Sequence, residues 1–307
     1  MKDLFELYLT KFLFMQLIVF LIIYPLLWCI SILPFRILYF FSDFVYLIIY
    51  YIIGYRKKTV RENLALALPH LSVQERLIIE KKSFRYLCDM FLEMIKTMTI
   101  SEQEIKKRFV FTNLEVYKNL ENKGKSIALM MAHYASYEWA VSLNYHVDFE
   151  GFGIYKKIYN PYFDKLVRTI RMKFKAKLIT TKETIPTIIE NNKANKLCTY
   201  GFASDQSPRL QSTHHWQSFM GKVVPVHTGA EMLSKKYDFN VIFLKNKRVS
   251  RGYYESSFEI LSENATEVPN YEITDKFIKL VEQQIYESPE FYLWTHKRWK
   301  HQKNLKD

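Results

Sequence analysis

The stretch that decides the fold is SIALMMAHYASYEW, residues 126–139. Its first six residues form a short apolar run, and His133 follows just after the run ends. An apolar run of this length is typical of a strand that is buried on both faces. Glu138 then lies at the start of an amphipathic segment, so the stretch predicts a buried strand, a tight turn and a helix.

The same alternation continues on both sides of this stretch. Short apolar runs predict strands at 126–131, 149–155, 177–180, 196–202 and 240–244. Amphipathic segments predict helices at 139–145, 161–174, 182–191 and 229–237. Residues 249–261 fit the return arm of a hairpin, and 271–287 fit a late helix. Alternation of this kind predicts an α/β fold with a largely parallel central sheet flanked by helices.

The chain before residue 56 has a different character. Residues 1–55 contain only six charged groups with a net charge of zero, so the rest of the chain carries the whole +13. Residues 12–33 lack charge altogether and, as a helix of about 1.5 Å per residue, would cross a hydrocarbon core of about 30 Å. Residues 35–54 include Arg36, Ser42 and Asp43, and this favours a segment in the interface, where polar ends of Tyr and Arg reach the headgroups. We therefore expect a membrane anchor at 1–55, preceding a basic α/β body at 56–307.

The basic cluster Arg56, Lys57, Lys58 and Arg61 follows the anchor directly. By the positive-inside rule it predicts that the body at 56–307 lies on the cytoplasmic side, against an anionic membrane surface. Within the body we expect a helical lead-in at 56–123, an α/β core at 124–295 and a basic tail at 296–307. The three scattered cysteines give no disulfide framework. The pair His214 and His215 has no third ligand at a usual metal spacing, so no metal is expected.

Chemistry is expected just after the strands, because ligands of open α/β sheets bind beyond the carboxyl ends of the strands. A tight turn could fold Glu138 back onto His133, where the carboxylate would fix the tautomer and leave the other ring nitrogen as a general base. On spacing alone, a structural histidine is an open alternative. A serine nucleophile at Ser136 is another, although no Gly-x-Ser-x-Gly elbow surrounds it.

His133, four residues and then Glu138 (an HX4E motif) resembles the H-x4-D/E signature of the lysophospholipid acyltransferase superfamily. Further blocks are similar to those of the bacterial late lipid A acyltransferases, which add secondary lauroyl or myristoyl chains. They are Gly153-Ile-Tyr155-Lys156-Lys157, Asn160-Pro161 with Arg168 and Arg171, Ala203-Ser-Asp205-Gln206, Phe219-Met-Gly221-Lys222 through Gly229, and Tyr292-Leu-Trp294-Thr-His296-Lys-Arg298. One departure is Ala135-Ser136-Tyr137, where the family commonly has Gly-Asn and an aromatic residue. Ala narrows the backbone choices of that turn.

The resemblance implies an enzyme that moves a fatty acyl chain from a thioester of acyl carrier protein, or of coenzyme A, to a hydroxyl of a lipid A precursor. It implies location at the bacterial inner membrane and no cofactor. His133 would remove the hydroxyl proton and Glu138 would orient the imidazole. Substrate-binding roles are expected for Ser136, Tyr155, Lys156, Arg171, Asp205 and Gln206, with Lys156 and Arg171 at acceptor phosphate or sugar and Asp205 paired with an arginine.

Two alternatives accompany this interpretation. The first keeps the chemistry and changes the acceptor to a lysophospholipid, an aminolipid or an aryl-polyene lipid. The second is a membrane-tethered nucleic-acid-binding protein, suggested by the +13 charge and 16% aromatic residues. No nucleic-acid-binding motif accompanies the scattered basic residues, which favours the enzyme.

Overall fold

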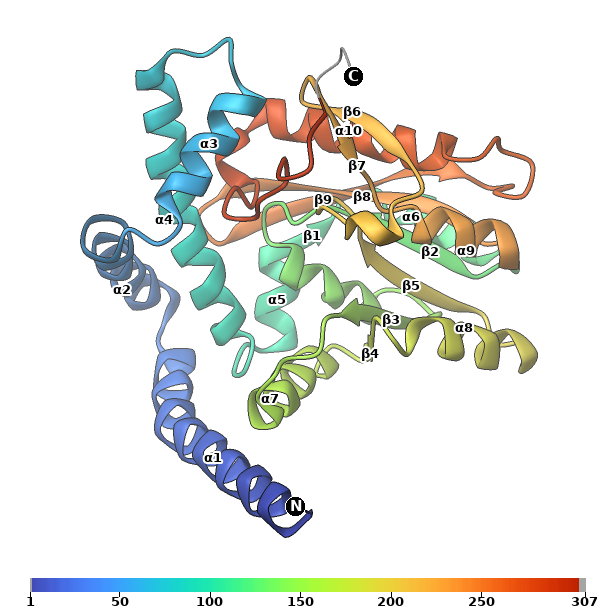
Figure 1. Ribbon diagram of the computed structural model, residues 1–307. Helices are drawn as coiled ribbons and strands as arrows, with labels where there is room; N and C mark the ends of the chain where they lie inside the picture. The colour runs from blue at the N-terminus through green and yellow to red at the C-terminus, as the bar shows by residue number, and fades with distance from the viewer. Residues whose placement is uncertain (1, 304–307) are drawn as a thin grey trace.

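A seven-stranded sheet with strand order β1-β9-β8-β2-β5-β3-β4 forms the centre of the computed structural model, which describes residues 2–303 and the side chains from residue 12 (Figure 1). The strands are β1 (Phe109–Phe111), β2 (Ile127–Met131), β3 (Glu150–Tyr155), β4 (Lys177–Thr180), β5 (Cys198–Ala203), β8 (Asn240–Ser250) and β9 (Tyr253–Ser262). All neighbours pair in parallel except β8 and β9, which form an antiparallel hairpin. The predicted fold class and the predicted hairpin are confirmed.

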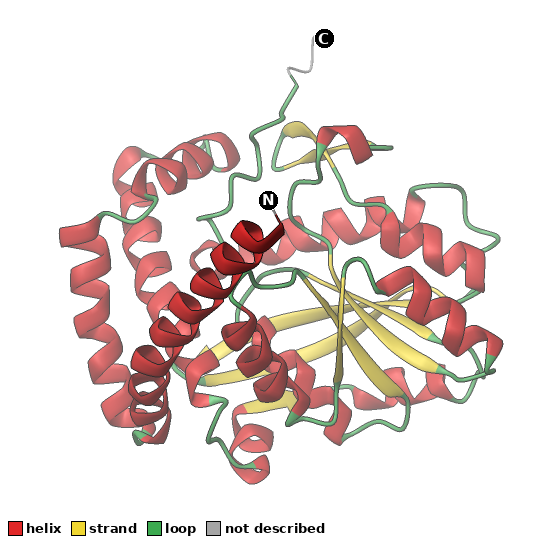
Figure 2. Cartoon of the chain, turned by 60° about the horizontal axis from the view of Figure 1, so that its bottom comes forward, coloured by secondary structure: helices red, strands yellow, loops and turns green. Residues whose placement is uncertain are grey.

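Helices cover both faces of this sheet (Figure 2). The helices of the body are α3 (Lys57–Ala67), α4 (Val73–Lys96), α5 (Glu102–Arg108), α6 (Leu114–Glu121), α7 (Pro161–Met172), α8 (Thr184–Lys193), α9 (Gly229–Tyr237) and α10 (Glu272–Glu287), with 3-10 turns η2 (Tyr137–Tyr145), η3 (Leu210–Ser212) and η4 (Pro289–Phe291). Helix α4 begins with a capping box in which Ser72 and Glu75 each accept a backbone hydrogen bond from the other residue.

Three elements differ from the sequence prediction. The lead-in is not wholly helical, because β1 lies within it and completes one edge of the sheet beside β9. Segment 139–145 is a 3-10 helix rather than an α-helix. A separate hairpin of β6 (Trp216–Phe219) and β7 (Lys222–Pro225) lies where no element was predicted. Strands of three and four residues are too short to give a clear period in the sequence.

Strand β2 lies at the centre of the sheet, with β8 on one side and β5 on the other. Its residues Ile127, Ala128 and Met130 are fully buried, which explains why the strand reads as a continuous apolar run. Because β2 and β5 are parallel, the residues after both strands emerge at the same edge of the sheet. The candidate site lies at this edge.

Two apolar helices precede the body. Helix α1 (Lys2–Ile32) extends away from the sheet in Figure 1, and α2 (Phe35–Leu47) continues into a π-helical turn, η1 (Ile48–Ile53). Residues Phe12–Ile32 and Phe35–Ile53 are each long and apolar enough to cross a membrane, judged by length and composition. Helix α1 meets the body at α7, where Phe20 stacks on Tyr162 and packs edge-on against Phe163.

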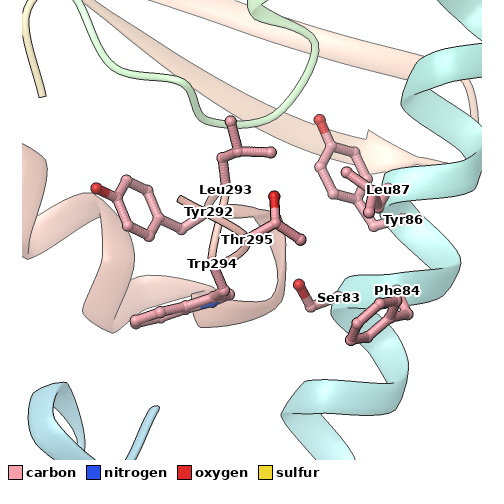
Figure 3. Close-up of a pocket in the computed structure, with 8 residues that line it drawn as sticks. All are labelled: Ser83, Phe84, Tyr86, Leu87, Tyr292, Leu293, Trp294 and Thr295. Carbon is pink, nitrogen blue, oxygen red and sulfur yellow. The ribbon is translucent and has the colours of Figure 1, made fainter. Parts of the chain in front are cut away.

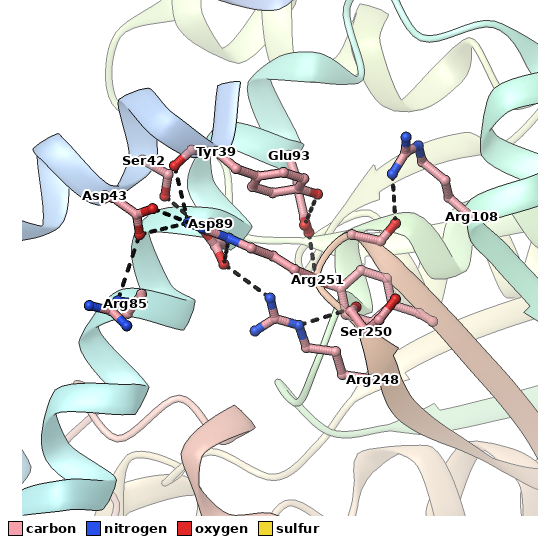
Figure 4. A network of polar contacts seen from close by, with 12 residues as sticks. Tyr39, Ser42, Asp43, Arg85, Asp89, Glu93, Arg108, Arg248, Ser250 and Arg251 are labelled. Atoms are coloured by element: carbon pink, nitrogen blue, oxygen red, sulfur yellow. Dashed lines mark hydrogen bonds and ion pairs between the residues drawn. The ribbon is translucent and has the colours of Figure 1, made fainter. Parts of the chain in front are cut away.

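Three polar residues of α2, Tyr39, Ser42 and Asp43, bind the body (Figure 4). Tyr39 donates a hydrogen bond to Glu93 of α4 at 2.7 Å, and Ser42 donates to Asp89 at 2.7 Å. Arg251, at the tip of the β8–β9 hairpin, bridges Asp89 and Asp43. We expected the polar ends of residues 35–54 to lie among lipid headgroups. This expectation is wrong for Tyr39, Ser42 and Asp43, which dock α2 on the body.

The expected basic tail is only partly a tail. Arg298 is 1% exposed, and Trp299 is buried with its ring stacked on Trp294. Residues 296–299 thus belong to the packed body, and residues 304–307 of the predicted tail lie outside the described residues.

Candidate active site

Strand register brings His133 and Asp205 together. Met131 at the end of β2 pairs with Ala203 at the end of β5, and each functional residue lies two positions further along its chain. The backbone N–H of Ser204 donates to the carbonyl of Met131 at 3.2 Å and prolongs the pairing. Both side chains therefore leave the sheet at the same height.

The two residues form a close pair. Oδ1 of Asp205 lies 2.7 Å from Nδ1 of His133 and also accepts the backbone N–H of His133 at 3.0 Å. Burial lowers the pKa of His133, but the Asp205 carboxylate outweighs burial and raises that pKa above its usual value. Burial likewise opposes ionisation of Asp205, which is 1% exposed, yet the hydrogen bonds from His133 hold its pKa below the usual range. The pair is an ionised carboxylate with an imidazole whose Nδ1 is engaged, which leaves Nε2 for a substrate.

Glu138 has a different partner from the expected one. Arg171, in the last turn of α7, donates to both of its oxygens, from Nε at 2.9 Å and from Nη2 at 2.7 Å. This is a two-point arginine–carboxylate pair, a strong and directional arrangement. The expectation that Glu138 hydrogen-bonds the His133 ring is wrong, and so is the expectation that Asp205 pairs with an arginine. Glu138 acts on His133 only through its charge, which also raises the pKa of the imidazole.

The turn between His133 and Glu138 has left-handed backbone at Ala135, with φ of 47°. This is the position where the resemblance led us to expect Gly, and an L-residue is disfavoured there by about 1–2 kcal/mol. The N–H of Ala135 donates to the carbonyl of Phe291 at 3.0 Å, which holds the turn in place. Tyr137 then packs edge-on against the His133 ring, with 4.9 Å between centroids.

His133 lines a cavity of about 700 Å³ that runs between the sheet and η2. Its wall is mainly apolar and includes Leu129, Met131, Phe152, Leu143 and Gly201. The volume lies in the range of about 300–1,000 Å³ that is usual for pockets that enclose a small ligand. Asp205 does not belong to the lining residues and lies buried behind the half-buried imidazole of His133. An apolar cavity with such an imidazole on its wall suits a long hydrocarbon substrate.

The other predicted residues are placed unequally around this cavity. Tyr155, Lys156, Arg171 and Gln206 line it together with His133 and Glu138. The hydroxyl of Tyr155 is bound to Asp164, so only the ring of Tyr155 is available to a ligand. Ser136 is 1% exposed and does not belong to the lining residues, which removes the geometric basis for a serine nucleophile or a substrate contact there.

Several lining residues were not predicted from the sequence, among them Met94, Tyr137 and His227. Met94 comes from α4, and no pattern in the sequence connects that helix with the strand that carries His133. Tyr137 and His227 stand beside predicted features, Tyr137 within the turn and His227 before α9. Burial lowers the pKa of His227, with a further lowering from the charge of Arg298. His227 lies two residues after β7, and because that strand was not predicted, no sequence signal indicated that this histidine faces the cavity.

Comparison with known proteins identifies the family of this chain. The family described as bacterial lipid A biosynthesis acyltransferase matches residues 8–301. The chain belongs to this family. It is also 23% identical over 246 residues to the lipid A biosynthesis lauroyltransferase of Escherichia coli (strain K12), an alignment that covers 80% of this chain and 79% of that protein. Membership identifies the chain as an acyltransferase of lipid A biosynthesis, and the match spans both the helical lead-in and the cavity.

Proposed function

We propose that this protein transfers a fatty acyl chain from a thioester, carried by acyl carrier protein or coenzyme A, to a hydroxyl of a lipid A precursor. The observation that carries the proposal is His133 on the wall of the apolar cavity, with its Nδ1 held by buried Asp205. The family match favours a lipid A acceptor over a lysophospholipid, an aminolipid or an aryl-polyene lipid.

In the proposed mechanism His133 is the general base. Nδ1–H donates to Asp205, so the lone pair of Nε2 accepts the proton of the acceptor hydroxyl as its oxygen attacks the thioester carbonyl. A C–O bond forms, the C–S bond breaks, and the departing thiolate takes the proton back from the imidazolium. General-base assistance of this kind is worth roughly 10²–10⁴-fold in rate.

Asp205 and Glu138 have separate tasks in this mechanism. Asp205 orients the ring and stabilises the imidazolium through a direct hydrogen bond. Glu138 adds negative charge near the ring and holds Arg171 at the cavity wall. Because Arg171 is already paired, exposed Lys156 is the better candidate for a phosphate of the acceptor. Gln206 lies on the same wall and is a candidate for a polar contact to the acceptor sugar.

The acyl chain of the donor would occupy the apolar part of the cavity. Three glycines, Gly151, Gly153 and Gly201, line this part, and a Cβ on Gly151 would overlap the side chain of Asn144. A Cβ on Gly153 would likewise overlap Leu178, so glycine at these two positions lets Asn144 and Leu178 pack closely against the sheet. Burial of about 0.8 kcal/mol per CH₂ would favour long chains over short ones.

The N-terminal helices supply the proposed anchor. Outward-facing apolar side chains on both helices, among them Phe14, Ile22, Phe40 and Ile52, suit contact with lipid. Together with the basic cluster after residue 55, they support attachment of the 56–307 body to the cytoplasmic face of the bacterial inner membrane. An amphiphilic acceptor would then reach the cavity from the membrane surface.

The test is mass spectrometry of lipid A and phospholipids from bacterial cells with and without the protein. The proposal predicts that loss of the protein removes one acyl chain from lipid A, and that the plasmid-borne gene restores it. Unchanged lipid A beside a shifted phospholipid profile would contradict the proposed acceptor.

A further inference from the structure

The chain segment 291–298 holds the loop that carries His133. Phe291 accepts the N–H of Ala135 at 3.0 Å, and the N–H of Leu293 donates to the carbonyl of His133 at 3.2 Å. Tyr134 and Tyr292 form an isolated antiparallel bridge between the same two segments. This part of the chain therefore acts as a short extra strand beside the catalytic turn.

The same segment also holds the loop that carries Asp205. Nε2 of His296 lies 3.2 Å from the backbone N of Ser207, two residues after Asp205, and accepts its hydrogen bond. A ring nitrogen accepts only while it is unprotonated. Burial lowers the pKa of His296 to about 4, which keeps the ring neutral and this contact intact at physiological pH.

Contacts from the helical lead-in fix the segment from behind. Nδ2 of buried Asn63, in α3, donates to the carbonyls of Trp294 and His296, each at 2.7 Å. Figure 3 shows residues Tyr292 to Thr295 against Ser83, Phe84, Tyr86 and Leu87 of α4, around a cavity of about 10 Å³. His296 thus stands on a rigid base and reaches forward to the Asp205 loop.

We propose that His296 is a positioning residue for acyl transfer, which holds the Asp205 loop so that the carboxylate meets Nδ1 of His133. This inference rests on the proposed function, in which His133 is the base. His296 reaches the Asp205 loop through the amide of Ser207, so its effect on the reaction passes through Asp205. Loss of the acceptor leaves the Ser207 N–H without its partner and releases the loop, and a misplacement of about 1 Å can cost roughly 10²-fold in rate.

The pH profile of kcat/KM distinguishes a positioning role of His296 from a purely structural one, because a purely structural role would leave the profile unchanged. The charged and titratable groups around the His133 ring are Asp205, Glu138, Arg171, Tyr137, His227 and His296. Asp205 is the main group that raises the pKa of His133, while burial lowers it. If the Asp205 loop is released, the pKa of His133 falls. His133 is then unprotonated, and able to act as the base, down to a lower pH. The acid limb of the kcat/KM profile therefore moves to lower pH.

The experiment compares His296→Leu with His296→Gln in the full-length protein, purified in detergent and assayed with an acyl thioester and a lipid A precursor. His296→Leu removes the acceptor, whereas the amide oxygen of Gln can replace Nε2. We expect kcat of His296→Leu to fall roughly 10–100-fold with KM within a factor of about two, and the acid limb to move to lower pH. His296→Gln should recover most of kcat and the normal limb. His70→Leu, at an exposed histidine, is the matched control and should behave as the wild type.

A normal kcat and acid limb for His296→Leu would overturn the inference, as would equal damage from Leu and Gln. If the melting temperature shows that His296→Leu does not fold, Asn63→Ala decides, because it loosens the same segment from the far side. That variant should lower kcat and move the acid limb in the same direction, and an unchanged profile would overturn the inference. His133→Ala in the same assay separates the two claims: activity there contradicts the base, whereas inactivity there with normal His296→Leu contradicts only the role of His296.

Discussion

Replacement of Asp205 by Asn tests the division of labour in the catalytic pair. One oxygen, Oδ1, accepts both the backbone N–H and the Nδ1–H of His133, at 3.0 and 2.7 Å. The backbone N–H of His133 can only donate a hydrogen bond. It therefore requires the amide oxygen of the new Asn, rather than its NH₂ group, in the place of Oδ1. The ring therefore keeps Nδ1 protonated and Nε2 available, and the substitution removes charge without changing the geometry.

The size of the effect follows from that geometry. A hydrogen bond to a charged group is worth a net of about 1.5–3 kcal/mol, and the imidazolium of the transition state loses its charged partner. At about 1.36 kcal/mol per tenfold, kcat/KM should fall about 10- to 150-fold. Since Asp205 raises the pKa of His133, its neutral replacement should also move the acid limb of the pH profile to lower pH.

The assay measures acyl transfer by full-length protein in detergent across a pH series, with Asp148→Asn as a control at an exposed aspartate. A kcat/KM within about threefold of wild type and an unmoved acid limb would refute the assignment of Asp205 as partner of the base. A movement of the limb to higher pH would refute the electrostatic argument.

Three further substitutions test other parts of the account. Arg171→Lys keeps the positive charge and loses the two-point pair with Glu138. We expect kcat to fall at least about tenfold, with the melting temperature within about 5 °C of the wild type. A normal kcat would contradict a role of Arg171 in the active site. Ala135→Gly relieves left-handed backbone strain of about 1–2 kcal/mol, while the greater entropy of the unfolded chain costs about 0.4–1 kcal/mol of stability. Activity should therefore persist, and the melting temperature should change little or rise slightly. Loss of activity would contradict this and show that the Ala135 methyl group is needed. Burial raises the pKa of Glu93 to about 7. The folded state therefore binds the proton more tightly than the unfolded state, and stability falls as pH rises from about 4.5 to 7. Glu93→Gln should flatten that decline in chemical denaturation, and an unaltered pH dependence would contradict the raised pKa.

The sequence predicted the strands of the central sheet well, because parallel strands buried on both faces give continuous apolar runs. It also indicated the sheet edge at which the candidate site lies, since His133, Asp205 and Gln206 follow such runs. The pairing of His133 with Asp205 was missed because it depends on which strands are neighbours. Once Met131 is known to pair with Ala203, equal offsets of two residues place the two side chains together.

Long-range polar partners lay beyond the sequence patterns. Glu138 and Arg171 are 33 positions apart and meet only because α7 packs near the turn after β2. The polar groups of α2 show the same limit. Composition alone does not distinguish whether Ser42 and Asp43 of an apolar helix contact lipid headgroups or polar side chains of the body. The contacts of Asn63 and His296, which join the lead-in to the catalytic loops, likewise depend on tertiary packing alone.

The central claim, that His133 is the base for acyl transfer, has one direct test. In isolated membranes, His133→Ala should abolish acyl transfer to a lipid A precursor. The melting temperature should show that the variant remains folded, and fractionation should show that it remains membrane-bound. Near wild-type transfer by the same membranes would contradict the claim.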